Sequence, residues 1–276
     1  MRWSWYQSVL NSGPSRFYDL FLTDKSTNTS IPFWQVANDG NLLPEPLKVS
    51  DVVLGVAERM DIVIDFKRWA GKTLYLENRL IQTDGRGPDA NPGAPNSLHP
   101  PGRGNFILQF RVGGTAVADN SMDLETNPYM QYYAMPARVA PRLSRTFRFK
   151  RSNSLWTIND KIFPDDFSLV HFRVKQNAAE HWTIENEEAE WMHPIHIHFE
   201  EFQLVTHNGA PIGPGHVYYS RKDVLRAQHF DTHKLYIRFR DFEGRYLMHC
   251  HNIIHEDHAQ MIRFDIDQTG DTQERP

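Results

Sequence analysis

The chain has 276 residues, which is enough for two domains of ordinary size. Hydrophobic residues make up 40% of it, so packed cores can form, and the net charge of −4 argues against a bulk positive field that binds nucleic acid or membrane surfaces. No apolar run approaches the roughly 18 residues that span a bilayer. The first residues contain no signal-peptide pattern, but Met1 need not be the true start of the protein.

Short runs of alternating hydrophobic and polar residues, separated by turn residues, predict strands in the N-terminal half. Examples are residues 61–66, 72–77 and 106–112. Residues 80–105 are rich in Gly, Pro, Asn and Asp, and we expect them to form a loop. This half predicts a first β-domain over residues 1–112.

The C-terminal half begins after a predicted linker at residues 113–142. A second run of strands starts near Thr146 and includes residues 234–240, and we place a second domain at residues 143–268, followed by a tail at 269–276. Long helical periodicity is missing throughout. The fold class expected is therefore all-β, with two β-sandwich domains of Greek-key type.

Histidine is unevenly distributed along the chain. Of the 14 histidines, 11 lie between His193 and His258, and only His99 occurs in the first 170 residues. The single cysteine, Cys250, cannot form a disulfide within the chain. A lone cysteine is usually a small buried hydrophobic residue, but the neighbours of this one indicate chemistry.

The segment His-Cys-His-Asn-Ile-Ile-His at residues 249–255 carries the first chemical signal. Side chains alternate between the two faces of a strand, so His249 and His251 point one way and Cys250 points the other. One short strand can thus serve two metal sites, with a thiolate on one side and two imidazoles on the other.

The segment Trp-Met-His-Pro-Ile-His-Ile-His at residues 191–198 follows the same logic. His196 and His198 share a face, and Ile197 opposes them. Pro194 interrupts the ladder and lets His193 point elsewhere.

Ligand type then selects the metal. One thiolate and two imidazoles, with a weak distant axial group, form the blue-copper arrangement, and His193, Cys250 and His255 supply that set. An imidazole-only group suited to further copper remains: His196, His198, His249 and His251.

Other chemistries fit these residues less well. Structural zinc favours CxxC pairs, which the chain lacks, and a cysteine nucleophile needs one base rather than a ring of histidines. So many histidines at this spacing argue against a purely structural role. A surface or structural role is expected for the others, namely His99, His171, His181, His207, His216, His229, His233 and His258.

The two motifs, at 193–198 and 249–261, resemble the C-terminal copper motifs of multicopper oxidases. The His-Glu-Asp at 255–257 is typical of the bilirubin oxidase and spore-coat laccase branch. Upstream, residues 13–18, 33–35 with 39–40, and 58–61 resemble that family's middle domain. The resemblance covers nearly the whole chain and implies that both domains are cupredoxin-like.

The resemblance also implies roles for individual residues. It makes copper the cofactor and the activity an oxidation of a phenol, aromatic amine, tetrapyrrole or metal ion, coupled to reduction of O2 to water. Glu256 matches a carboxylate that relays protons toward oxygen. The copper ligands implied are His193, Cys250 and His255 for type 1 copper, His196 for type 2, and His198, His249 and His251 for type 3.

Two positions depart from the family pattern. The axial position of the type 1 site falls on Gln260, where most of the branch has Met, and a shift of one residue would present Met261 instead. The trinuclear centre of the family needs eight histidines, four of them from HxH motifs of an N-terminal domain, and residues 1–170 contain no HxH.

Three hypotheses account for the missing ligands. The chain is the C-terminal part of a three-domain oxidase, or another chain supplies the missing domain, or the chain is a stand-alone copper-binding or electron-transfer module without oxidase activity. The family implies a periplasmic or secreted location, although this sequence itself leaves the location open.

Overall fold

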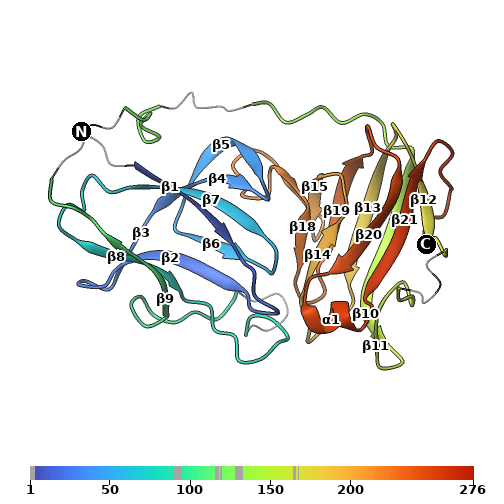
Figure 1. Ribbon diagram of the computed structural model, residues 1–276, viewed down its shortest axis with the longest axis horizontal. Coiled ribbons are helices and arrows are strands. Elements are labelled where there is room, and N and C mark those ends of the chain that lie inside the picture. The colour runs from blue at the N-terminus through green and yellow to red at the C-terminus, as the bar shows by residue number, and fades with distance from the viewer. Residues whose placement is uncertain are drawn as a thin grey trace. The chain divides into compact units, whose positions relative to one another are not determined.

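A computed structural model describes residues 4–89, 95–115, 118, 120–127, 133–163, 166 and 168–276 (Figure 1). It divides into two compact units, Met1–Met135 and Pro136–Pro276. Both are built from strands, and the only helix within the described ranges is α1 (Ile253–Asp257). No helix of the described residues has the length and apolar character needed to cross a membrane.

The first unit contains two sheets. One has the order β1-β7-β4-β5, and the other has the order β3-β2-β8-β9 with β6 paired to β2. Its strands are β1 (Ser4–Leu10), β2 (Tyr18–Asp24), β3 (Thr29–Ile31), β4 (Phe33–Asn38), β5 (Asn41–Val49), β6 (Asp51–Leu54), β7 (Arg59–Asp65), β8 (Thr73–Asn78) and β9 (Asn105–Arg111).

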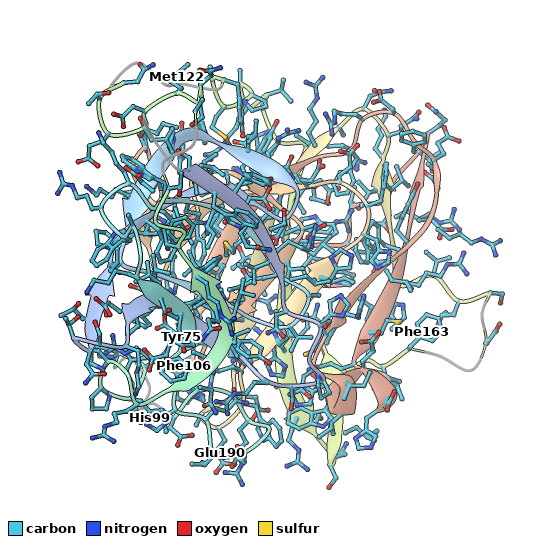
Figure 2. The ribbon with its side chains drawn as sticks, turned by 60° about the vertical axis from the view of Figure 1, so that its left-hand side comes forward. Tyr75, His99, Phe106, Met122, Phe163 and Glu190 are labelled. Atoms are coloured by element: carbon cyan, nitrogen blue, oxygen red, sulfur yellow. The ribbon has the colours of Figure 1, made fainter. Side chains whose placement is uncertain are left out.

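Alternation along the strands builds the core of this unit. In β7, Met60, Ile62 and Ile64 are buried and pack with residues of β2 and β8, so both sheets face one hydrophobic core. The Tyr75 and Phe106 rings lie 4.5 Å apart on neighbouring strands (Figure 2).

The second unit also contains two sheets, of order β11-β10-β13-β19-β15-β16, with β17 on β15, and β12-β21-β20-β14-β18. Its strands are β10 (Leu143–Ser152), β11 (Leu155–Ile158), β12 (Phe172–Lys175), β13 (Ala179–Asn186), β14 (His193–Ile197), β15 (Phe202–His207), β16 (Ala210–Pro211), β17 (Arg221–Lys222), β18 (Val224–Ala227), β19 (Thr232–Arg238), β20 (Gly244–Cys250) and β21 (Met261–Asp267).

One hydrophobic core joins the two sheets of this unit. Trp182 and Leu235 come from one sheet, Ile195 and Phe264 come from the other, and all four are fully buried. Figure 1 shows the strands of this unit in two layers, with α1 directly after β20. The sandwich fixes β14 and β20 side by side, which positions the histidine motifs.

The predicted strands lie where the sequence placed them, with bounds shifted by one or two residues. The proposed linker at 113–142 has no strand in its described part; residues 116, 117, 119 and 128–132 lie outside the described residues. The C-terminal tail packs against β10: Thr146 N donates to Glu274 O at 2.8 Å, and buried Arg145 binds Asp271 Oδ1 at 2.9 Å.

Candidate metal centre

The antiparallel ladder between β14 and β20 organises the site. Its register places Ile195 opposite Cys250 and His196 opposite His249. Because side chains alternate along both strands, the cysteine and the two facing histidines project from opposite faces. The predicted division of one strand between two clusters is thus present in the fold.

Three side chains converge on the Cys250 side of the ladder. Cys250 Sγ lies 3.5 Å from His193 Nδ1 and 3.4 Å from His255 Nδ1, and the two Nδ1 atoms are 3.1 Å apart. Ligands on one ion with bonds of roughly 2.0–2.3 Å are separated by roughly 3.3–3.8 Å. The three atoms have nearly this spacing, and all three residues are fully buried.

A short helix that sequence reasoning missed positions His255. The Asn252 side chain caps α1 by accepting from Ile254 N, and the Asn252 backbone N–H donates to Cys250 Sγ at 3.4 Å. The helix turn then brings His255 back over the cysteine that precedes it by five residues. Asn252 therefore both caps the helix and contacts the cysteine of the cluster.

Burial sets the protonation of this cluster. It lowers the pKa of His193 to about 3 and the pKa of His255 to about 2. Burial also raises the pKa of the Cys250 thiol far above its usual range. At neutral pH both imidazoles are neutral and able to coordinate, and the thiol loses its proton only when a cation replaces it.

Gln260 is the candidate for the axial ligand of this cluster. Its Nε2 donates to Thr157 O at 3.3 Å, whereas its buried Oε1 has no hydrogen-bond partner among the described residues. Met261 instead pairs with His249 across the β20–β21 ladder, so it shares the face of His249 rather than that of Cys250. An orphaned buried oxygen beside two imidazoles fits a bound cation.

Two tryptophans cover the imidazole of His255. The Trp156 ring stacks on it with ring centroids 3.8 Å apart, and Trp191 meets it edge-on at 4.9 Å. Trp156 comes from β11, about a hundred residues earlier in the chain, so no local sequence signal could reveal this contact.

Four histidines gather on the opposite face of the ladder. His196, His249 and His251 have nitrogen atoms within 4.8 Å of one another, and His198 Nε2 lies 3.3 Å from His249 Nε2. Burial and the neighbouring imidazoles lower the pKa of His249 to about 3. Burial also lowers the pKa of His198, and this cluster contains imidazoles but no thiol.

Neighbouring oxygens orient these rings. His196 Nδ1 lies 2.8 Å from Asp223 O, which fixes Nδ1 as the protonated nitrogen and leaves Nε2 to face the cluster. Glu256 extends one carboxylate oxygen to His249 Nδ1 at 3.4 Å and the other to His251 Nδ1 at 3.7 Å. Burial raises the pKa of Glu256, so its proton exchanges closer to neutral pH than that of a solvated glutamate.

The remaining histidines are dispersed, with one exception. His99 lies on the loop before β9 and is partly exposed (Figure 2), and the buried His171 accepts a hydrogen bond from Arg263 N at 3.1 Å. His207 and His233, however, meet Asp231 in a third group of potential ligands, which the sequence interpretation did not single out.

Known proteins give independent information on this chain. Residues 136–270 match the family model described as multicopper oxidase. Bilirubin oxidase from Albifimbria verrucaria is 30% identical over 92% of this chain and 43% of its own length, and the laccase of Bacillus subtilis (strain 168) is 28% identical over 94% and 50%. The chain therefore spans about half the length of these curated relatives.

Solved structures show the same fold. The multicopper oxidase McoA from the hyperthermophile Aquifex aeolicus superimposes with a TM-score of 0.77 at 22% identity, covering 95% of this chain and 55% of McoA. Together with the strand content, this likeness confirms the predicted all-β, cupredoxin-like sandwich fold.

Fold and family model together place residues 136–270 among the cupredoxin-like domains of multicopper oxidases. The chain belongs to the multicopper oxidase family, and its similarity to laccases and a bilirubin oxidase confirms the resemblance seen in the sequence motifs.

Proposed function

We propose that this chain is the part of a laccase-like oxidase that takes electrons from a reducing substrate and delivers them toward a trinuclear copper centre, where O2 is reduced to water. The observation that carries the proposal is the position of Cys250. Its Sγ belongs to one cluster, while its chain neighbours His249 and His251 belong to the other. Electrons thus have a short covalent route between the two clusters.

His193, Cys250 and His255 would hold the type 1 copper, with Gln260 as the axial ligand. The convergent Nδ1 and Sγ atoms and the orphaned Gln260 Oε1 support this assignment. When bound there, copper supplies reversible one-electron chemistry. The protein contributes a fully buried set of side chains with neutral imidazoles, which holds the ligands in place before the metal arrives.

On the other face, His196 would bind type 2 copper, and His198, His249 and His251 would bind the type 3 pair. Glu256, which contacts two of these rings, would hold and transfer protons beside them. These four histidines are half of the eight that the trinuclear centre of the family needs. We propose that a further cupredoxin domain, in the same or another chain, supplies the rest.

For the domains, we propose that residues 1–112 form the ligand-free middle cupredoxin domain and residues 143–268 the copper-binding one. The greater length of the curated relatives supports a further domain. The substrate class remains a phenol, aromatic amine, tetrapyrrole or metal ion. A stand-alone electron-transfer module is less favoured, because the relatives are named as oxidases and laccases.

Copper quantification with a visible spectrum tests the type 1 site. The copper-loaded chain should show an intense thiolate-to-Cu(II) charge-transfer band that Cys250→Ser abolishes. His251→Ala is the matched control, because it removes an imidazole of the other cluster and should leave the band intact. A band that survives in Cys250→Ser, or disappears in a folded His251→Ala protein, would contradict the assignment.

A further inference from the structure

A second set of metal-ligating side chains lies outside the two copper clusters, between β15 and β19. The antiparallel register places His207 directly opposite His233. Their rings stack in parallel with centroids 4.4 Å apart. Asp231 precedes His233 by two residues, and its carboxylate reaches the same place, 3.0 Å from His207 Nε2 and 3.8 Å from His233 Nε2.

These separations are close to those of ligands that share one small ion. Tetrahedral ligands with bonds of roughly 2.0–2.1 Å lie roughly 3.3–3.5 Å apart. Asp231 Oδ1 lies 3.0 Å from His207 Nε2 and Asp231 Oδ2 lies 3.8 Å from His233 Nε2, just below and just above that range. All three ligand atoms lie within 4.8 Å of one another. Little movement is needed to place them on one cation.

His233 points to a ligand independently of this spacing. Its side chain is only 1% exposed, and neither ring nitrogen has a hydrogen-bond partner among the described residues. A neutral imidazole carries one donor and one acceptor, and buried polar atoms of both kinds are normally paired. Burial lowers the pKa of His233 to about 3, so the ring is neutral at physiological pH and free to coordinate.

The carboxylate is held in place as metal-binding carboxylates usually are. Asp231 Oδ1 accepts from Asn208 Nδ2 at 2.9 Å, and Oδ2 accepts from Gln228 N at 2.9 Å. The Asn208 amide oxygen in turn accepts from Thr232 N at 2.8 Å, which closes the link between the two strands. Such outer contacts fix the orientation of a ligand before the ion binds.

We propose that His207, Asp231 and His233 form a separate binding site for a divalent transition-metal ion of the zinc class. Two imidazoles and one carboxylate are a ligand set that zinc uses, with a fourth position left open. His207 is the solvent-accessible member of this set, with a side chain that is 34% exposed, while the other two side chains are buried. The ion enters and exchanges from that side.

The site is connected to the first copper motif through Asn186. Asn186 N donates to Asp231 O at 2.9 Å, and its side-chain amide donates to Trp191 O at 2.8 Å, two residues before His193. A cation at Asp231 therefore stabilises the segment that carries a type 1 ligand, and it clamps the β18–β19 connection to the end of β15.

Zinc titration of the metal-free chain tests the proposal, with Zn²⁺ alone as the probe. Because the copper clusters can also take zinc, the informative quantity is the difference between variants. His207→Ala and Asp231→Asn should each bind one Zn²⁺ fewer than the wild type, or bind that ion more than about 100-fold more weakly, since loss of an outer contact alone costs about 10–100-fold. His181→Ala removes another partly buried imidazole of the same unit and should leave the zinc count unchanged.

Two further readouts separate a lost site from a lost fold. The imidazole nitrogen chemical shifts of His207 and His233 should move together as Zn²⁺ is added. After copper loading, His207→Ala should keep the thiolate charge-transfer band of the wild type. Unchanged zinc stoichiometry and affinity in both His207→Ala and Asp231→Asn would overturn the proposal, and the copper assignments would be unaffected by that result.

Discussion

The two histidine clusters on opposite faces of the β14–β20 ladder differ in how completely they are enclosed. The cluster of His193, Cys250 and His255 has no exposed surface, and aromatic rings close it from one side. In the other cluster only His249 is buried, and His196, His198 and His251 are partly exposed. The second unit of the chain thus encloses the first cluster by itself, whereas the second cluster presents its histidines from one side only.

This difference teaches which part of the chemistry a single domain can build. A site with three ligands forms when a turn of the chain brings one more side chain back to the ladder between two strands. The helix α1 provides that turn and carries His255. A centre of three metal ions needs ligands from several directions, because each ion must be surrounded.

The largest expected difference between the two clusters is in oxygen consumption. The purified 276-residue chain should take up copper at the enclosed cluster but show no robust four-electron reduction of O2 with an aromatic donor, because four histidines on one side cannot hold three coppers together. Slow oxidation that forms peroxide is still compatible with this arrangement. Robust turnover to water with about four coppers per chain would defeat the contrast.

Copper affinity of the enclosed cluster should depend steeply on pH. The imidazoles stay neutral above about pH 4, because the pKa values of His193 and His255 are lowered to about 3 and about 2, whereas the Cys250 thiol keeps its proton until copper displaces it. One proton released per copper raises the affinity about tenfold per pH unit between pH 5 and 8. Competition against a chelator of known pH dependence measures it, and a flat profile would exclude the thiolate.

The metal-free chain should lose stability in mild acid. His193, His249 and His233 each have a folded-state pKa of about 3, against 6.5 in the unfolded chain. Between those values the unfolded state binds more protons, so the free energy of unfolding falls as pH falls from 6.5 toward 3. Each residue contributes up to about 1.4 kcal/mol per pH unit. Urea midpoints at pH 7 and pH 5 should show the loss, and equal midpoints would argue against neutral buried imidazoles.

The axial ligand gives the smallest effect. If Gln260 Oε1 is the axial donor, Gln260→Met should raise the type 1 potential, because a thioether stabilises Cu(II) less than an amide oxygen does. We expect a change on the order of 59 mV, which corresponds to a tenfold change in a one-electron equilibrium. Met261→Leu is the control and should change little. Control of the potential by Met261 instead would show that the ligand register is shifted by one residue.

Several features could be predicted from sequence because they depend on local geometry. The period of two along a strand places the Cys250 side chain on the face opposite that of His249. The β14–β20 register agrees with this, because Cys250 pairs with Ile195 and His249 pairs with His196. The strands were recognisable because their hydrophobic alternation reflects a core on one face, as in β7. The short helix α1 was missed, since five residues are too few to show helical periodicity.

By itself the sequence determined the donor chemistry of the candidate ligands and the all-β class, because donor atoms and alternation are properties of neighbouring residues. Only the tertiary structure decided which distant residues meet. Trp156 covers His255 across 99 positions of the chain, and His207 faces Asp231 and His233 across a strand pair whose register no local pattern specifies. Burial was decided there as well, and it is burial that keeps the imidazoles of His233 and His255 neutral.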